Sequence, residues 1–282
     1  MFKNQINLIE KRKITVKKLK ILFPIISLFL LISSNTHAQR RNVNVPTKTL
    51  PKEVIDEENF KSILSFGLTT NTNSGLLGGL MVRKEYVIDN NSFHRQFHYF
   101  NLEIVNVNHY RENSYTPPSG TGNSYTLGKL NYLFAIRPQY GREINIFRKS
   151  SEGGVNINAI LAGGPTLGIL KPYFVQINYG RGGLKDEAFD PTRHITNTNV
   201  VGSGIAGSGS FFEGLGDSQI VPGVNLKAAL NFELDAFRQS NISLEIGFLA
   251  EVYTKKINIM ALTENRSMFT SGYVTIFFGG KK

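Results

Sequence analysis

The chain has 282 residues, a formal net charge of +11 and no cysteine, and apolar side chains make up 41% of it. The absence of cysteine excludes stabilisation by disulfides. Residues 39–282 keep only 25 of the 32 basic and 20 of the 21 acidic side chains, a net charge of about +5 that gives no reason to expect nucleic-acid binding.

Residues 1–38 have the features of a secretory signal peptide. The basic stretch "KRKITVKKLK" precedes "ILFPIISLFLLISS", an apolar segment that is too short and too broken by Pro24 to cross a bilayer as a helix. Thr36 and Ala38 occupy the small-residue positions that predict cleavage after Ala38. Residues 39–60 are polar and contain two prolines, which indicates a periplasmic N-terminal linker.

Eight runs in which apolar and polar side chains alternate follow the linker. Each is long enough to cross hydrocarbon as a tilted strand, which takes about 9–11 residues, and bacterial outer-membrane barrels have an even number of strands. Residues 61–282 are therefore expected to form an all-β domain, an eight-stranded antiparallel up-and-down transmembrane β-barrel. The runs are residues 61–70, 76–86, 95–110, 126–143, 155–168, 220–237, 242–253 and 268–279.

The connections between the runs alternate between long and short. If the linker is periplasmic, connections one, three, five and seven face outside the cell, and three of these four are long, as in known outer-membrane barrels. Connection five, about 169–219, is rich in glycine and is expected to be a flexible loop. Its "GSGIAG" (202–207) matches a dinucleotide-binding pattern but has no strand before it or helix after it, so no cofactor is predicted.

The run over residues 220–237 shows what each face is expected to contact. Its apolar positions, from Val224 to Leu234, contain no polar residue, and its other positions mix small residues with Lys227, Asn231 and Glu233. A lysine facing lipid at the bilayer midplane costs roughly 2–4 kcal/mol, whereas the narrow lumen of eight strands suits small and ionic side chains. A secreted, soluble, lipocalin-like barrel is the alternative, because an apolar core would impose the same alternation. Tyrosines near run ends predict interfacial girdles; they are Tyr86, Tyr110, Tyr140, Tyr173 and Tyr253.

An ionic network is predicted inside the barrel. Strand parity places Glu233 opposite or diagonal to Glu245, and because two carboxylates repel one another, a nearby cation is expected to neutralise them. That cation is Arg83, Arg137 or Lys227, and the resulting network is expected to plug the lumen. A catalytic acid–base pair is the alternative role for the two carboxylates. The predicted network consists of Arg83, Glu103, Arg137, Lys227, Glu233 and Glu245.

Two further groups of residues carry catalytic or metal-binding residue types. His109 with Ser114, and His194 with nearby serines, supply what a barrel enzyme acting on envelope lipid would need, but without a recognisable spacing. Asp186, Glu187, Asp190 and His194 offer ligands for a divalent cation, but their spacing matches no known calcium loop. The prediction is that the chain has no catalytic residue and no metal site, with a lipid-modifying enzyme as the alternative.

Three stretches of the chain are "YLFAIRPQYGREINIFRK", "ILAGGPTLGILKPY" and "ENRSMFTSGYVTIFFG". They resemble a family of small outer-membrane β-barrel proteins from Bacteroidota, and the resemblance covers most of residues 60–282. It implies an exported protein of the cell outer membrane and implies no particular reaction, ligand or functional residue. The expected role is structural or accessory, as a surface loop platform or a barrel subunit. The expected partners are outer-membrane lipid and subunits of an envelope or secretion complex.

Overall fold

The computed structural model describes residues 60–89, 95–117, 123–148, 155–194, 204–237, 240–261 and 263–282. The predicted signal peptide, residues 1–38, and the predicted linker as far as residue 59 lie outside the described residues. Within the described ranges no helix is long and apolar enough to cross a membrane.

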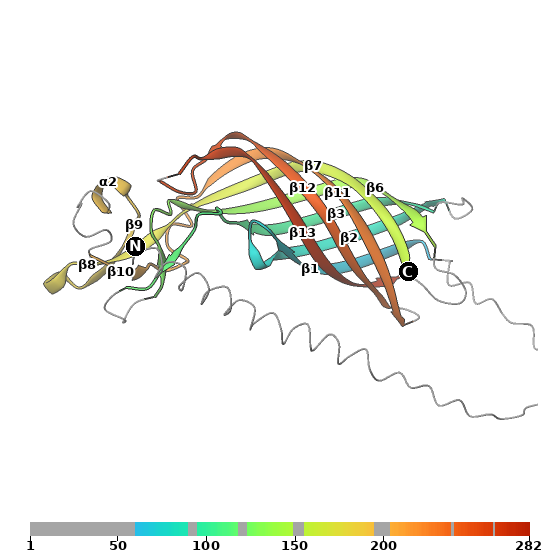
Figure 1. Ribbon diagram of the computed structural model, residues 1–282, viewed down its shortest axis with the longest axis horizontal. Helices are drawn as coiled ribbons and strands as arrows, with labels where there is room; N and C mark the ends of the chain where they lie inside the picture. Colours follow the sequence, from blue (N-terminus) through green and yellow to red (C-terminus); the bar gives the residue numbers. More distant parts are fainter. Residues whose placement is uncertain are drawn as a thin grey trace, which may run out of the picture. The chain divides into compact units, whose positions relative to one another are not determined.

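Eight antiparallel strands close into a barrel (Figure 1). Neighbours along the chain pair with one another, and β1 pairs with β13 to complete the circle, with Phe66 opposite Phe278. The predicted eight-stranded up-and-down barrel is confirmed. The strands are β1 (Ser62–Asn71), β2 (Gly75–Asp89), β3 (Gln96–Val107), β6 (Asn131–Phe147), β7 (Asn156–Pro172), β11 (Gln219–Phe237), β12 (Ser240–Ile257) and β13 (Arg266–Lys281).

Each of the eight predicted runs corresponds to one barrel strand. The largest error in a boundary concerns the fourth run, because residues 126–130 do not belong to β6. Thr126 ends the short strand β5 (Tyr125–Thr126), which pairs with β4 (Ser114–Tyr115), and Gly128 then adopts a positive φ of 80° in a turn. The alternation of apolar and polar residues continues through this turn, but strand β6 begins only at Asn131.

The two ends of the barrel differ. The backbone N–H groups of Lys61 and Ser62 donate to the carbonyl of Lys282, so the barrel begins and finishes at one end, which we call the termini end. Connections one, three, five and seven all lie at the opposite, distal end, in agreement with the predicted alternation. The longest of them extends beyond the barrel on the side away from the C-terminus (Figure 1).

A small three-stranded sheet forms within this longest connection. It consists of β8 (Phe174–Asn178), β9 (Leu184–Ala188) and β10 (Ile205–Ser208), in the order β10-β8-β9, and we call it the distal sheet. A 3-10 helix (Gly180–Gly182) follows β8, and helix α2 (Pro191–His194) follows β9.

The expectation of a flexible, glycine-rich loop is therefore wrong for the described residues of this connection, 173–194 and 204–218. Val175, Ile177, Phe189 and Ile205 pack into a buried cluster with two tyrosines, Tyr125 and Tyr173. The second half of the "GSGIAG" pattern belongs to β10 rather than to a loop. Strands of four or five residues contain too few alternations to be recognised among so many glycines.

The barrel carries its apolar side chains outside and its polar side chains inside. Large apolar residues such as Leu226 and Phe248 point outward, and Phe248 is 77% exposed. Arg83, Lys227 and Glu245 point inward and are fully buried. A soluble barrel has the reverse arrangement, whereas a barrel in lipid has an apolar outer band and a polar interior. This excludes the lipocalin-like alternative and identifies a transmembrane barrel.

Glycines on the inner face make room for large rings. A Cβ atom at Gly67 would lie 2.7 Å from the ring of Phe277, and one at Gly168 would lie 2.6 Å from the ring of Tyr253. At these distances the ring or the backbone would have to shift to admit any larger residue. The small inward residues therefore allow a narrow lumen to hold bulky aromatic side chains.

Candidate functional site

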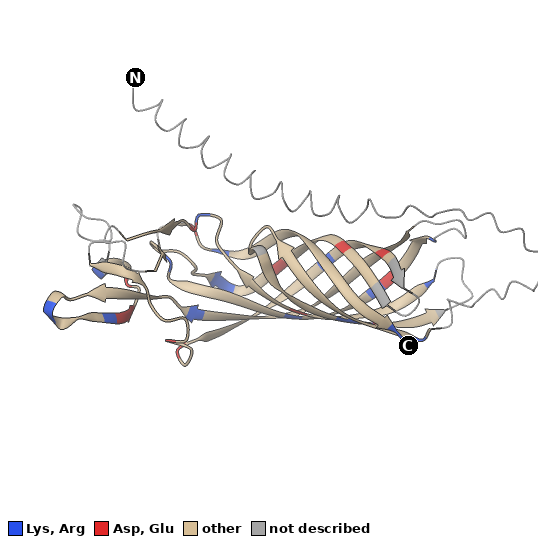
Figure 2. Ribbon diagram, turned by 90° about the horizontal axis from the view of Figure 1, so that it is seen from below, with Lys and Arg blue, Asp and Glu red and all other residues tan. Residues whose placement is uncertain are grey.

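The lumen is filled by side chains arranged in successive layers. Along β3, from the distal end toward the termini end, the inward residues are Val105, Glu103, Asn101 and Tyr99, all buried. They belong in turn to an apolar cap, an ionic cluster, an amide layer and a second ionic cluster. Figure 2 shows acidic and basic positions lying along the barrel strands.

The central ionic cluster joins three strands across the lumen. The carboxylate of Glu245 on β12 lies 2.7 Å from the ammonium of Lys227 on β11 and 3.2 Å from the guanidinium of Arg83 on β2. The Nε of Arg83 also lies 2.7 Å from Glu85. All four side chains are almost completely buried, so each charge depends on its partners rather than on water.

Aromatic side chains complete this cluster. The hydroxyl of Tyr273 donates to Glu245 at 2.6 Å, and the ammonium of Lys227 lies 5.2 Å from the ring of Tyr273 and 5.1 Å from that of Tyr99. The guanidinium of Arg83 sits 4.0 Å above the ring of Phe277. Cations over ring faces gain attraction when they are desolvated, so these rings add to the stabilisation of the buried cations.

The distal ionic cluster is centred on Arg137 of β6. Its Nε and one terminal nitrogen donate to the two oxygens of Glu251, both at 2.8 Å, and its other terminal nitrogen donates to Glu103 at 3.0 Å. The hydroxyl of Tyr253 adds a hydrogen bond of 3.1 Å to Glu251. A planar guanidinium suits this two-point recognition of a carboxylate, which lysine could not reproduce.

A row of amides separates the two ionic clusters. Asn101 donates to Gln139 at 2.9 Å, Gln139 donates to Asn225 at 2.8 Å, and Asn225 donates to the hydroxyl of Thr166 at 2.9 Å. This chain runs along one half of the barrel wall, from β3 through β6 and β11 to β7. All four side chains are buried in the lumen.

Glu233 has a different environment from the one that parity predicts. Glu233 pairs with Ser243 in the β11–β12 register, so it is diagonal to Glu245, as expected. However, Asn158 at 2.8 Å and Asn156 at 3.4 Å, both from β7, donate to Glu233. Arg83 and Lys227 contact Glu245 instead. The neighbouring strand β7 supplies partners to Glu233 that two-strand parity does not consider.

Three buried glutamates were not part of the predicted network. Glu85 contacts Arg83, Glu251 contacts Arg137, and Glu143 accepts hydrogen bonds from Asn158 at 2.7 Å and Asn231 at 3.1 Å. The sequence indicated that these side chains face inward, because Glu85 has the same parity as Arg83 on β2 and Glu143 has the same parity as Arg137 on β6. Alternation alone would have placed all three on the inner face.

An apolar cap closes the distal end of the lumen. The segment that connects β12 to β13 crosses the mouth, where the carbonyl of Ile259 accepts the N–H of Leu130 at 2.8 Å. The buried residues of the cap come from five barrel strands and this segment. They are Val105, Val107, Leu133, Ala135, Leu170, Val221, Tyr253, Ile257, Ile259 and Met260.

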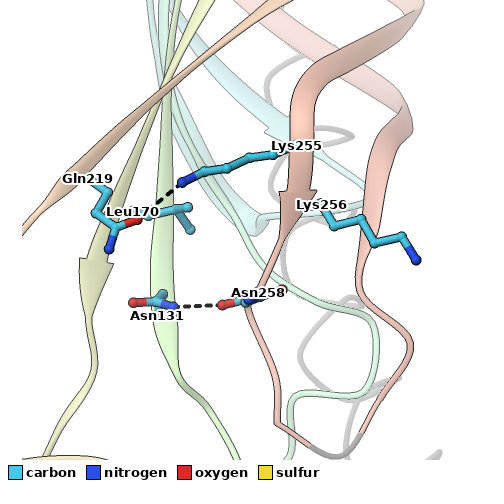
Figure 3. A pocket seen from close by; sticks show the side chains of 6 residues that line it. All are labelled: Asn131, Leu170, Gln219, Lys255, Lys256 and Asn258. Carbon is cyan, nitrogen blue, oxygen red and sulfur yellow. Dashed lines mark hydrogen bonds between the residues drawn. The ribbon is translucent and has the colours of Figure 1, made fainter.

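A small polar pocket lies beside this crossing segment (Figure 3). Its volume is about 150 Å³, and Leu170 and Lys256 contribute to its lining. The ammonium of Lys255 extends across it to Gln219 at 3.2 Å, and Asn131 donates to the carbonyl of Asn258 at 2.7 Å. The bond from Asn131 joins the segment to β6, whereas the bond from Lys255 joins β12 to β11, so the pocket lies at the closure of the mouth.

A second distal pocket, of about 320 Å³, brings together the residue types of the enzyme alternative. His109, Glu112 and Ser114 all line it. The ring Nδ1 of His109, however, accepts the backbone N–H of Arg111 at 3.2 Å. The two oxygens of Glu112 accept the backbone N–H of His109 at 2.8 Å and the ammonium of Lys129 at 2.5 Å. The hydrogen bonds of these described residues therefore do not join the three side chains into a proton relay.

The protonation of His109 agrees with this arrangement. Burial lowers the pKa of His109 from its ordinary value of 6.5, because the charged ring is poorly solvated. The neighbouring charges of Arg111 and Arg266 act in the same direction, and Glu112 opposes them. The ring is therefore neutral at pH 7, carries its proton on Nε2 and accepts through Nδ1.

The acidic residues of the candidate cation site do not converge. Asp186 accepts hydrogen bonds from Gln176 and from the backbone of Ser210, and Glu187 accepts one from Tyr179. Asp190 binds the backbone and hydroxyl of Thr192 at the start of α2. In the part of the chain that the structure describes, no group of three or more such side chains is placed to hold a metal ion.

The tyrosines of the predicted girdles divide into two groups. Tyr86, Tyr110 and Tyr140 are exposed on the outside. Tyr173 and Tyr253 are buried, one in the core of the distal sheet and the other inside the lumen. The expectation is wrong for these two, because position near a strand end does not determine which side of the wall a ring faces.

Comparisons with known proteins concern the fold. No protein-family model matches the chain, and neither does any curated protein. The solved structure of Neisserial surface protein A is similar at 9% identity and a TM-score of 0.35, covering 79% of this chain and 97% of that one. Ail, the attachment invasion locus protein of Yersinia pestis, was solved with the heparin analogue sucrose octasulfate. It is similar at 9% identity and a TM-score of 0.30, with the same coverage of each chain.

Proposed function

We propose that this chain is an outer-membrane β-barrel protein that conducts no solute and displays a folded distal sheet at the cell surface. The termini end faces the periplasm, and the distal end faces the exterior. The role is structural or accessory: a platform that binds another macromolecule, or a barrel subunit of an envelope or secretion complex. In either role the barrel contacts outer-membrane lipid, and we propose no nucleic-acid partner.

The filling of the lumen is the observation that carries this proposal. Two ionic clusters, an amide row and an apolar cap occupy the interior of the barrel, and the buried side chains of Glu143, Asn158 and Glu233 add to this filling. Eight-stranded barrels are just wide enough for side chains to fill them, whereas wider porins leave an aqueous channel. A filled barrel cannot serve as a pore. The surfaces that remain available for binding are the outer wall and the distal end.

We expect the purified barrel to show no steady conductance in planar bilayers, because buried side chains of the ionic clusters, the amide row and the distal cap fill the lumen. The measurement is single-channel recording of the full chain after its folding is checked by heat-modifiable gel migration. A matched recording on a variant with the cap residues Ile257 and Ile259 changed to glycine tests whether the cap contributes. A steady ohmic conductance of the unaltered protein would contradict the plugged lumen.

The distal sheet is the part of the molecule best suited to bind a partner. It has its own buried core, against which Tyr132 at the distal end of β6 also packs. Leu184 and Tyr179 are exposed near the turn between β8 and β9. No reaction is included in the proposal, because the ring of His109 and the carboxylate of Glu112 each accept a backbone N–H in the distal pocket.

The platform role can be tested by removing the distal sheet. We expect replacement of residues 174–208 by a short Gly-Ser linker to leave the barrel folded and to abolish co-purification of partners in mild detergent. Heat-modifiable migration of the variant serves as the control for folding. If the same proteins co-purify with both forms, the barrel wall binds them and the distal sheet does not. If neither form retains any protein, the platform role is wrong.

A further inference from the structure

A short loop between β10 and β11 exposes large apolar side chains outside the barrel. We call residues 210–216, "SFFEGLG", the aromatic loop. Phe211 is 48% exposed, Phe212 76% and Leu215 53%. Apolar side chains gathered in this way on a loop indicate an interaction surface, because loops that face water are normally polar.

The aromatic loop is continuous with the lipid-facing surface of the barrel. The ring of Phe211 packs edge-on against Tyr132 at 5.8 Å and against Phe134 at 6.1 Å. These residues have the outward parity of β6, the strand whose alternate residues Leu133 and Ala135 are buried in the cap. The ring of Phe212 packs in turn on Phe211 at 5.6 Å. The apolar outer surface of β6 therefore continues beyond the distal end of the barrel wall onto the loop.

The position of the loop is held by specific contacts. The backbone N–H of Ser210 donates to Asp186 at 2.9 Å, and that of Gly209 donates to the carbonyl of Phe174 at 2.9 Å. Gly214 has a φ of 71°, and a Cβ atom there would lie 2.3 Å from the ring of Phe174. These contacts join the loop to the distal sheet on one side, while Phe211 joins it to β6 on the other.

A basic side chain accompanies the rings. The ammonium of Lys171, at the distal end of β7, lies 5.2 Å from the ring of Phe211 and 5.3 Å from that of Tyr132. Lys171 is itself buried and donates to the carbonyl of Pro172 at 3.3 Å, so the rings cover this ammonium and are the exposed part of the surface. Exposed aromatic rings are typical of the boundary between hydrocarbon and headgroups.

We infer that the aromatic loop inserts into the outer leaflet at the boundary between hydrocarbon and headgroups, and so holds the distal sheet close to the membrane surface. The occupant of this apolar surface is lipid, because the surface continues the lipid-facing band without interruption. The inference rests on the proposed function, since it requires the barrel to lie in a membrane. It adds a membrane contact outside the barrel wall to the contacts that the strands make.

The test uses the absence of tryptophan from the chain, which makes any introduced tryptophan a unique fluorescent reporter. Three full-length variants are refolded into vesicles: Phe212→Trp in the aromatic loop, Phe248→Trp on the outward face of β12, and Tyr179→Trp on the distal sheet. Each is measured with lipids brominated near the headgroup or deep in the acyl chain, and with acrylamide in the water.

We expect shallow brominated lipids to quench Phe212→Trp by about twofold, and acrylamide to quench it several-fold less than Tyr179→Trp. Phe248→Trp should be quenched by deeply brominated lipid. If Phe248→Trp is quenched and Phe212→Trp is not, the membrane contact of the loop is wrong and the proposed function stands. If Phe248→Trp is not quenched either, the membrane barrel itself is wrong. If Phe212→Trp is protected from acrylamide only at high protein density and is not quenched by brominated lipid, a second copy of the chain covers the loop and lipid does not.

Discussion

Changing Arg137 to methionine is expected to destabilise the barrel by about 3–5 kcal/mol, the usual cost of removing one partner from a buried ion pair. Arg137 satisfies Glu103 and both oxygens of Glu251, and all three side chains are almost fully buried. Without the guanidinium, two carboxylates would remain in the lumen with no cation between them. The free energy of unfolding in urea, measured in lipid vesicles or detergent, gives the result directly.

Two controls separate this effect from a general effect of arginine removal. Arg193→Met removes an arginine that is also paired with a glutamate, Glu187 at 3.3 Å, but whose side chain is 63% exposed. Exposed pairs contribute about 0–1 kcal/mol, so little change is expected. Combining Arg137→Met with Glu103→Gln and Glu251→Gln removes the unpaired charges and should recover much of the loss. An Arg137→Met variant as stable as the unaltered protein would show that the cluster does not stabilise the barrel.

Changing Leu226 to arginine is expected to destabilise the barrel by about 2–4 kcal/mol, provided that this outward position lies near the bilayer midplane. Leu226 is 59% exposed in the middle of β11, and its neighbours in register are Ala250 and Gly163. In a water-soluble protein, a charge at such an exposed position would cost almost nothing. The size of the change in unfolding free energy therefore reports directly on the surroundings of the outer wall.

Leu184→Arg provides the matched control for this experiment. Leu184 is also an exposed leucine on a strand, but it lies in β9 of the distal sheet, where water is expected. Its replacement should change stability by less than about 0.5 kcal/mol, as is usual for surface positions. Equal and small effects of the two substitutions would contradict the membrane location of the barrel.

The barrel could be predicted because its strands are long and their alternation is regular. In β11 and β12, inward and outward residues alternate over most of the strand length, so chance interruptions do not hide the pattern. The distal sheet could not be predicted, because β8, β9 and β10 have only four or five residues each. Turns such as the one at Gly128 also interrupt strands at places where the pattern of side chains continues.

The sequence by itself determined which side chains face inward, because a strand turns successive residues to opposite sides. Parity alone therefore places Arg83, Arg137, Lys227 and Glu245 in the lumen. Only the tertiary structure decided which of them meet. Arg137 stands directly opposite Glu103 on the neighbouring strand, but it reaches Glu251 across the lumen, and Arg83 reaches Glu245 in the same way. Those contacts depend on how the strands tilt and stagger when the sheet closes, and this is a property of the whole barrel rather than of any one strand.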